Sequence, residues 1–398
     1  MKKKLARLKL KWKEHLEHDP TGFSFFCYCL KYCVIKVFRC LKDFYYIREF
    51  PVDPARVAVG VRLTGGLGDT IIHRRFLEKI AERCPNSDFF VFCAVPKQGR
   101  WVFGNVPYVK AVSPLEVFSG FQKRYADIVL HLNTFAFFDE QRCNFGKVQS
   151  LDPFLLEMFS SAREKRKEWD QFIDSHPSLD GAFARQAVVQ GFNRYNFIAH
   201  LLGIPVPEFA LDLAMDMERA DKLEKEYGRY ITVNTDFDNY FIIAGRTATK
   251  CYPQEYWERL TGLLKAKYPD LGIVQIGNKT GKHISKVDAD LAGKTTLPEC
   301  AGILKKSRLH IDIEGGLVHI CASIGTRCVT LFGPTSVEYF GYPQNIKLRD
   351  DGCPDCWWST QNWMERCPRK YPRPECMYKL TPEKILDAVS SILDGEAK

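Results

Sequence analysis

One passage of this chain constrains its fold more than any other. An apolar run beginning near Ile311 ends in Gly315 and Gly316, a stretch of helical character follows, and a second apolar run ends at Pro334. This order predicts strand, tight turn, helix and strand, which is the repeating unit of a doubly wound α/β domain. In such a domain, free backbone N–H groups and a helix N-terminus converge after the strand. We therefore expect a phosphorylated ligand to bind beside the two glycines.

The chain has 398 residues, enough for two domains and an extension. Its formal net charge is +9, but residues 1–50 contain twelve basic and five acidic side chains, so the other 348 residues carry only +2. The basic character therefore belongs to the N-terminal segment, which argues against a nucleic-acid-binding body.

The N-terminal segment combines basic residues with apolar residues at helical spacing. Between Phe23 and Leu41 the apolar positions repeat every three to four residues, but Lys31, Lys36 and Arg39 interrupt the run. The run is thus too short to span a bilayer, and no signal-peptide cleavage pattern follows it. Residues 1–42 are expected either to lie against anionic lipid or to pack on their own domain or on a second subunit.

A second glycine turn predicts a second α/β domain. Residues 56–63 form a β-rich run that leads into Gly65, Gly66 and Gly68 and then into a helical stretch reaching Arg83. Further buried strands are expected at 89–95, 128–132, 230–234, 272–277, 309–313 and 329–332, whereas 160–179 is charged and poorly patterned. We predict an extension at 1–50 and Rossmann-like domains at 51–225 and 226–398, with both glycine turns facing a shared cleft.

Fifteen cysteines without a secretory signal indicate a reducing compartment, where disulfides are rare. Four of them fall within 353–376, a proline-rich stretch that also holds three tryptophans: Cys353, Cys356, Cys367 and Cys376. Four thiolates around one zinc or iron ion would stabilise such a segment. The alternative is that these cysteines are buried and hold no metal. The cysteines at 27, 29, 33 and 40 are expected to act as small apolar side chains.

Residues 56–395 resemble glycosyltransferase family 9, the ADP-heptose-dependent heptosyltransferases. The resemblance rests on the order and spacing of five pieces, at 64–70 (TGGLGDT), 250–257 (KCYPQEYW), 291–296 (LAGKTT), 314–319 (EGGLVH) and 331–335 (LFGPT). It implies the two-domain GT-B fold, with an acceptor domain at 51–225 and a donor domain at 226–398. It also implies an ADP-sugar donor, transfer of a heptose to an acceptor hydroxyl with inversion, and no catalytic divalent metal.

The resemblance also assigns roles to residues. Asp69 would be the catalytic base, although an Asp at this position also commonly caps a helix N-terminus. Lys250, in a polar loop with Arg246 and Thr247, would contact the donor diphosphate; the alternative is a solvated surface lysine. Glu314 stands where the family usually has Asp, which puts contacts made by the shorter carboxylate in doubt.

Three further residues belong to the expected donor site. Leu317 begins the helix after the glycine pair, and His319 lies in its first turn. The His319 ring would contact phosphate or satisfy a hydrogen bond in the core. Gly277 begins a loop whose position alone suggests contact with the nucleoside.

The resemblance extends to the cysteine segment and the C-terminus. Heptosyltransferases that modify autotransporter proteins carry a comparable four-cysteine finger that binds iron, although the later spacings differ here. Residues 381–393 form a capped amphipathic helix, and in GT-B enzymes such a helix crosses back to the first domain.

Two other classes of function remain open from the sequence. One is an NAD-dependent oxidoreductase or epimerase, although the turn at 65–68 lacks the third glycine of the dinucleotide fingerprint. The other is a nucleic-acid-binding zinc protein. For a glycosyltransferase, we expect a cytoplasmic protein, either free or peripheral on the membrane, with a homo-oligomer as one option for its assembly. Its acceptor would be a lipopolysaccharide core sugar, another glycan, a lipid-linked glycan or a protein hydroxyl.

Overall fold

The computed structural model describes residues 50–173, 180–236, 248–353, 355–360 and 362–395, with scattered residues between 12 and 37. Arg246, Thr247 and most of the N-terminal extension lie outside the described residues. The described positions of the extension are helical, and their large apolar side chains are exposed: Trp12, Phe26, Leu30, Val34 and Val37. Across the described residues, no helix combines the length and the apolar character needed to cross a membrane.

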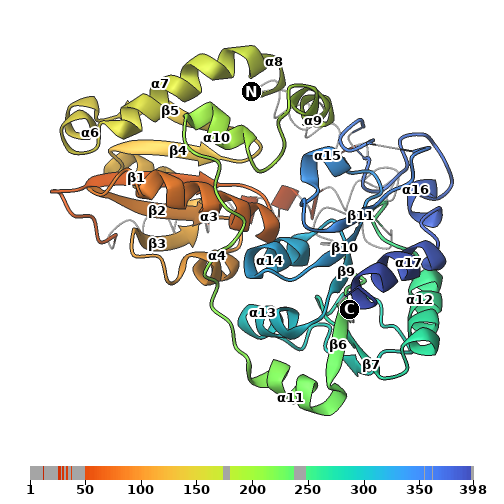
Figure 1. Cartoon of the computed structure of the whole chain (residues 1–398). Coiled ribbons are helices and arrows are strands. Elements are labelled where there is room, and N and C mark those ends of the chain that lie inside the picture. The colour runs from red at the N-terminus through yellow and green to blue at the C-terminus, as the bar shows by residue number, and fades with distance from the viewer. Residues whose placement is uncertain are drawn as a thin grey trace.

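The first sheet has the strand order β3-β2-β1-β4-β5 (Figure 1). Its first four strands in sequence run parallel, and β5 joins the edge antiparallel to β4. The strands are β1 (Val57–Leu63), β2 (Ser87–Cys93), β3 (Val109–Pro114), β4 (Ile128–Leu132) and β5 (Ala136–Cys143). The parallel strands at the centre are buried on both faces and are rich in Val, Ile and Phe, as the sequence predicted.

Helices cover both faces of this sheet. One face packs on α3 (Leu67–Ala81), α4 (Pro96–Phe103), α6 (Phe145–Leu151), α7 (Phe154–Arg166) and α10 (Phe197–Leu202). The other face carries a smaller aromatic core under η1 (Leu115–Val117) and α5 (Phe118–Arg124). In that core Phe121 lies 4.8 Å from Phe90 and 5.1 Å from Phe92, measured between ring centroids.

The segment that the sequence left unpatterned is helical in its described part. Helix α7 continues through η2 (Lys167–Trp169) into α8 (Asp170–Ile173), and α9 (Asp180–Val189) follows. Trp169 anchors this segment, since its buried ring lies 5.0 Å from Phe197 and 5.4 Å from Phe183. Aromatic packing from distant residues holds these helices, so their own periodicity gave little signal.

The second sheet is parallel throughout, in the order β11-β10-β9-β6-β7-β8. Its strands are β6 (Arg229–Val233), β7 (Leu271–Gln275), β8 (Ala289–Asp290), β9 (His310–Ile313), β10 (Cys328–Leu331) and β11 (Ile346–Leu348). One face is covered by α11 (Glu218–Tyr227), α13 (Leu297–Lys306) and α14 (Gly316–Ile324). Short helices α15 (Val337–Phe340) and α16 (Glu375–Tyr378) flank the cysteine segment.

We call the first sheet with its helices the first unit and the second sheet with its helices the second unit. The connection between them is an extended segment that follows α10. The Arg74 guanidinium donates to the Asp212 carbonyl at 2.9 Å, which holds this segment on the first unit. Four residues later the Asp216 N–H donates to the Pro298 carbonyl of the second unit at 3.0 Å. Helix α11 then packs on α13. The domain boundary at 225 stays a prediction, and this packing favours a division before Glu218.

The C-terminal helix differs from the expectation. Helix α17 (Pro382–Leu393) packs on α12 (Gln254–Lys267) and β10, all within the second unit, and does not cross to the first. Its apolar residues Ile385, Val389 and Ile392 complete the core on the otherwise open face of the second sheet. The helix thus stays with the second unit because its apolar side chains are buried against the sheet of that unit.

Helices α3 and α14 join the two units, and they lie together between the sheets (Figure 1). One continuous hydrophobic cluster includes residues of both helices. The approach is close at Gly68, where an added Cβ would lie 2.2 Å from Cδ2 of His319. Glycine is therefore required at 68 by the packing of one unit on the other.

We predict that Gly68→Ala destabilises the protein by about 1–3 kcal/mol, because the new methyl group must displace a buried ring or separate α3 from α14. Gly66→Ala is the matched control, since nothing lies within 4 Å of the Cβ it would add. Its cost should stay below about 1 kcal/mol, the loss of a favourable helix cap. Denaturant unfolding of both variants measures the difference, and equal destabilisation would contradict the packing argument.

Candidate functional site

The two glycine turns face each other across the contact between the units. Strand β1 leads through Gly65, whose φ of 110° favours glycine, to the α3 N-cap at Gly66. Strand β9 leads through Glu314 to the α14 N-cap at Gly315. An added Cβ on Gly316 would lie 3.6 Å from the Leu67 side chain. The structure therefore brings together the two turns that the sequence placed in one cleft.

Asp69 lies in the first turn of α3 and makes two kinds of contact. Its Oδ2 accepts a hydrogen bond from the Gly66 N–H at 3.0 Å, so it does cap the helix. Its Oδ1 pairs with Nη2 of Arg194 at 2.6 Å, and its side chain is 37% exposed. The carboxylate is thus held in place but remains partly exposed.

Arg194 is a site residue that the sequence analysis missed. Its side chain is only 5% exposed, and its Nη1 donates to the Asn133 carbonyl at 2.8 Å. Its backbone N–H donates to the Tyr339 carbonyl of the second unit at 2.9 Å. Arg194 and Asp69 are 125 residues apart, and no local motif marks Arg194 as a partner for a carboxylate.

These contacts shift the pKa values of Asp69 and the neighbouring His73. Burial acts to raise the pKa of Asp69, but the charges of Arg194 and His73 and the hydrogen bonds from Arg194 and Gly66 outweigh it, so the pKa lies below its ordinary value. His73, whose Nε2 lies 3.1 Å from the Asn133 carbonyl, has a pKa lowered to about 4 by burial and by Arg194. At neutral pH Asp69 is therefore an anion and His73 is uncharged.

Lys250 and Glu314 form a second ion pair on the donor side. Lys250 Nζ lies 2.6 Å from Glu314 Oε2, and the two side chains are 10% and 11% exposed. The interpretation of Lys250 as a solvated surface lysine is therefore wrong. Glu314 follows β9 directly, and its other oxygen lies 3.9 Å from Nε2 of His319. A buried cation, a carboxylate and an imidazole thus surround the start of α14, where free backbone N–H groups are found.

His319 satisfies one of its two ring nitrogens inside the protein. Nδ1 lies 2.7 Å from the Tyr342 hydroxyl, and the ring is almost fully buried. Burial is the main cause that lowers the pKa of His319 to about 4, with Glu314 acting in the opposite direction. The predicted core hydrogen bond is therefore present at Nδ1, while the Nε2 edge faces Gly68 and Glu314.

The loop beginning at Gly277 lies at the carboxyl end of β7. Gly277 has a φ of 130°, and an added Cβ would lie 2.3 Å from Oδ1 of Asn234, which follows β6. Asn234 donates to both oxygens of buried Asp312 at 3.1 Å. This network fixes the ends of three neighbouring strands. Arg246 and Thr247, expected nearby, lie outside the described residues.

The four cysteines of the finger lie close enough for their thiols to interact with one another. Burial, with the neighbouring thiols, raises the pKa of Cys356 to about 11 and that of Cys376 to about 12. Among the described residues, no three His, Cys, Asp or Glu side chains are placed so that they could hold a metal ion. The structure therefore does not confirm the predicted metal site.

Backbone hydrogen bonds connect the finger to the loop that carries Lys250. The Thr249 N–H donates to the Met364 carbonyl and the Thr249 hydroxyl donates to the Trp363 carbonyl, each at 2.8 Å. A cavity of about 520 Å³ lies between this loop and the finger. The finger thus helps to hold the loop that carries Lys250 in place.

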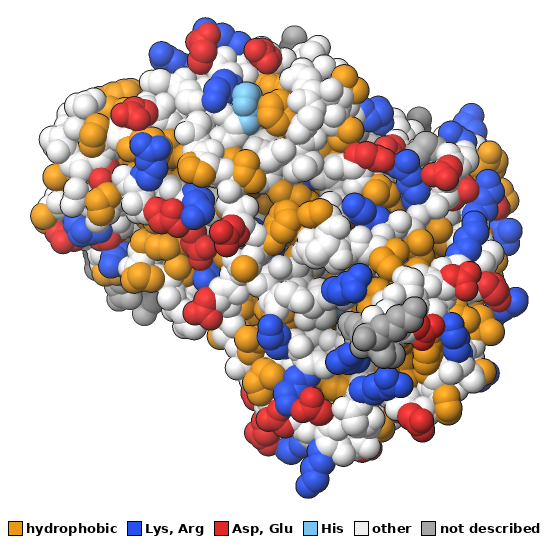
Figure 2. All heavy atoms as spheres, viewed as in Figure 1, with side chains coloured by type: hydrophobic (Ala, Val, Ile, Leu, Met, Phe, Trp, Pro, Cys, Tyr) orange, Lys and Arg blue, Asp and Glu red, His pale blue; other side chains and the backbone are white. Residues whose placement is uncertain are grey.

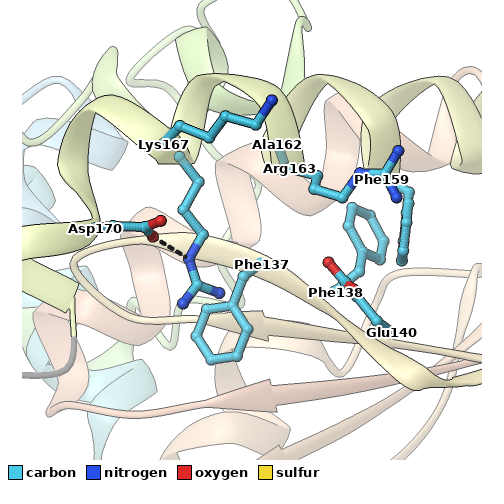
Figure 3. Close-up of a pocket in the computed structure, with 9 residues that line it drawn as sticks. Phe137, Phe138, Glu140, Phe159, Ala162, Arg163, Lys167 and Asp170 are labelled. Carbon is cyan, nitrogen blue, oxygen red and sulfur yellow. Dashed lines mark hydrogen bonds and ion pairs between the residues drawn. The ribbon is translucent and has the colours of Figure 1, made fainter.

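A separate cavity of about 340 Å³ lies between β5 and α7 at the edge of the first sheet (Figure 3). The rings of Phe137 and Phe159 face it, and the Arg166 guanidinium, paired with Asp170, lies 5.3 Å from the Phe137 ring centroid. Aromatic rings beside guanidinium groups suit sugar rings and anionic groups.

Comparison with known proteins agrees with this architecture. Residues 178–350 match the model of glycosyltransferase family 9 (heptosyltransferase). Lipopolysaccharide heptosyltransferase 1 of Pseudomonas aeruginosa is 22% identical over 209 residues, or 49% of this chain. That match spans 56% of the relative, so the chain covers only about half its length.

Two solved structures share the fold. A family 9 glycosyltransferase from Veillonella parvula has a TM-score of 0.54 at 16% identity and covers 86% of this chain and 98% of its own. TibC, an iron-containing dodecameric glycosyltransferase of enterotoxigenic E. coli, has a TM-score of 0.53 at 14% identity, with coverages of 85% and 77%.

Two Rossmann-like units that meet at their glycine turns define the GT-B fold, as the sequence predicted. Within that class, residues 178–350 are similar to glycosyltransferase family 9.

Removing the Arg194 charge should raise the pKa of Asp69. In Arg194→Met the burial of the carboxyl persists without its main opposing charge, so Asp69 should titrate above its ordinary value, whereas in the native protein it titrates below. Carbon-13 NMR of labelled aspartate side chains over a pH series measures this shift. Arg166→Met removes a guanidinium from a different aspartate, Asp170, and should leave Asp69 unchanged. An unshifted Asp69 in Arg194→Met would contradict the assigned electrostatics.

Proposed function

We propose that this protein transfers a sugar from a nucleotide diphosphate sugar to an acceptor hydroxyl, with inversion at the anomeric carbon. The observation that carries the proposal is the placement of an ionised Asp69 across the domain contact from the Gly315–Gly316 helix terminus. Asp69 accepts the proton of the acceptor hydroxyl while its oxygen attacks the anomeric carbon. The bond from that carbon to the diphosphate breaks, and the nucleoside diphosphate leaves with the bonding pair.

The donor side stabilises the departing diphosphate. Lys250 is a buried cation with three donor hydrogens, so it can keep its contact with Glu314 and still reach a phosphate oxygen. The free N–H groups of α14 add positive potential at the same point. This scheme uses fixed protein charges and dipoles and requires no catalytic divalent metal.

The similarity of residues 178–350 to glycosyltransferase family 9 favours ADP-heptose as the donor. TibC, which shares the fold, has been crystallised with ADP-D-β-D-heptose, and the curated relative is a lipopolysaccharide heptosyltransferase. We extend the same donor class to this chain. The candidate acceptors are a lipopolysaccharide core sugar, another glycan, a lipid-linked glycan and a protein hydroxyl. The cavity beside Phe137 offers contacts to sugar rings and anionic groups.

The two other functions are less well supported. The first glycine turn contacts α14 of the second unit. In a Rossmann-type oxidoreductase, by contrast, the glycine turn binds the dinucleotide within one domain. On the face shown in Figure 2, basic side chains are interspersed with acidic ones rather than forming a continuous basic surface. That distribution offers little for an extended nucleic acid backbone.

Peripheral binding to a membrane or to a second copy of the chain is proposed for residues 1–42. In its described part, Phe26, Leu30, Val34 and Val37 are helical and between 47% and 62% exposed. Their spacing places them along one side of a helix, which disfavours packing on the chain's own domains. Sedimentation with anionic vesicles, compared with light scattering of the free protein, separates the two partners.

Asp69→Asn should lower the rate of heptose transfer by about 10²- to 10⁴-fold, because the amide cannot accept the acceptor proton. ADP binding should persist, since Lys250 and α14 are untouched. Glu78, on the same helix, pairs with Arg74 at 2.9 Å, and Glu78→Gln should retain the native rate. Transfer is followed by ADP release with matched donor and acceptor, and retention of most activity in Asp69→Asn would show that another group is the base.

We also propose that Cys353, Cys356, Cys367 and Cys376 hold one structural zinc or iron ion. Each thiol of this set interacts electrostatically with its neighbours, and Asp355 and Lys370 adopt left-handed backbone conformations, with φ of 45° and 61°, that make tight turns beside the cysteines. The ion would cross-link a segment with little regular structure. TibC, a protein of the same fold, contains iron.

Elemental analysis of purified protein should therefore find about one zinc or iron per chain, and Cys353→Ser or Cys376→Ser should remove it and lower the unfolding temperature. Cys251→Ser is the matched control, because Cys251 lines the adjacent cavity but is not one of the four. A native protein free of both metals, purified without chelator, would eliminate the proposed site.

A further inference from the structure

We propose that Arg75 and Tyr342 are positioning residues that fix His319 as its Nε2–H tautomer, so that uncharged His319 donates a hydrogen bond to the donor diphosphate at the start of α14. The inference rests on the proposed function for the identity of the ligand. The hydrogen bonds that lead from Arg75 through Tyr342 to His319, which we call the relay, are present in the ligand-free protein.

Arg75 sets the direction of the relay. Its side chain is buried within α3, and its Nη1 donates to the Tyr342 hydroxyl at 2.8 Å. Its Nη2 donates to the Ser323 hydroxyl at 2.9 Å. A guanidinium can only donate, so both hydroxyl oxygens must accept from it and each hydroxyl proton must point elsewhere.

Both protons then find acceptors on His319. The Ser323 hydroxyl donates to the His319 carbonyl at 2.9 Å, and Nδ1 of His319 lies 2.7 Å from the Tyr342 hydroxyl. The neighbouring Tyr195 ring stacks on Tyr342 at 4.3 Å, and its hydroxyl donates to the Phe340 carbonyl. Tyr195 also acts as a hydrogen-bond donor toward the Tyr342 hydroxyl, since this contact acts to lower the pKa of Tyr342 and to raise that of Tyr195. Nδ1 of His319 is therefore the acceptor for the Tyr342 proton.

An uncharged imidazole carries one N–H, and an accepting Nδ1 leaves that hydrogen on Nε2. The low pKa of His319, near 4 because of burial, keeps the ring uncharged at neutral pH. Nε2 faces the junction of the two glycine turns, where an added Cβ on Gly68 would lie 2.7 Å away. Its closest described anion, Glu314, lies 3.9 Å away and is engaged by Lys250. The Nε2–H is thus available to a ligand oxygen.

The relay crosses between the two units. Arg75 belongs to the first unit, whereas Tyr342, Ser323 and His319 belong to the second. When the units separate, Tyr342 loses the donor that fixes its orientation and can accept from an Nδ1–H instead. Docking of the acceptor domain therefore completes the donor site, which ties diphosphate stabilisation to the arrangement that brings Asp69 near the sugar.

Nitrogen-15 NMR of histidine-labelled protein without ligand tests the relay directly. The His319 signals are assigned by comparison with His319→Gln. In the native protein Nδ1 should resonate as an unprotonated nitrogen and Nε2 as a protonated one. In Tyr342→Phe the two tautomers should mix or reverse, and ADP affinity should fall about 3- to 10-fold, the loss expected for one oriented hydrogen bond.

Tyr230→Phe is the matched control, because it removes a buried hydroxyl of the second unit that donates to the Ile303 carbonyl and takes no part in these contacts. It should preserve the tautomer and keep ADP affinity within about twofold. Arg75→Lys is the second variant if Tyr342→Phe does not fold, and it should also mix the tautomers, since one ammonium cannot hold both hydroxyls in the fork geometry.

Three outcomes would overturn the proposal. A native His319 protonated on Nδ1, or a tautomer unchanged in both relay variants, rejects the relay. A changed tautomer with unchanged ADP affinity rejects the contact with diphosphate. Failure of the proposed function is seen separately, as a native protein with the Nε2–H tautomer that neither binds ADP nor transfers a sugar.

Discussion

The close approach of α3 to α14 is the constraint on which the rest of the structure depends. Gly68 admits the His319 ring where any larger residue would collide with it, and Gly316 admits the Leu67 side chain. Because both helices begin at glycine turns after parallel strands, this contact places the two helix N-termini in one region. The site is therefore a product of domain packing, and neither sheet contains it alone.

Charge is arranged in two ion pairs on either side of this contact. Asp69 pairs with Arg194, and Glu314 pairs with Lys250, each at 2.6 Å. Breaking either pair by removing one partner would leave a charge in a poorly solvated place, which is strongly unfavourable. The pairs thus balance the charges beside this contact while holding a partly exposed carboxylate on one side and a buried cation on the other.

Local patterns predicted the fold, one residue of the Asp69–Arg194 pair and both residues of the Lys250–Glu314 pair. Buried parallel strands, glycine turns and capped helices carry their signal within ten residues, so β1, β9, α14 and α17 were found with nearly correct bounds. Edge strand β5 and helix α7 were not, because β5 mixes polar residues into an irregular pairing and α7 depends on aromatic contacts made far along the chain. Arg194 and Tyr342 were missed for the same reason: their partners are distant in sequence. The prediction that α17 crosses to the first domain was wrong. The sequence of the helix does not reveal that one face of the second sheet lacks a covering helix.

Within the described residues, the backbone passes between the units once, after α10, yet they touch again at the finger. Arg185 of α9 donates to the Asp355 carbonyl at 3.3 Å, and Gly181 leaves no room for a side chain against the Trp357 carbonyl. The finger thus adds a contact between the units to the packing of α3 on α14. Loosening the finger would therefore weaken the attachment of α9 to the second unit while leaving the glycine turns in contact.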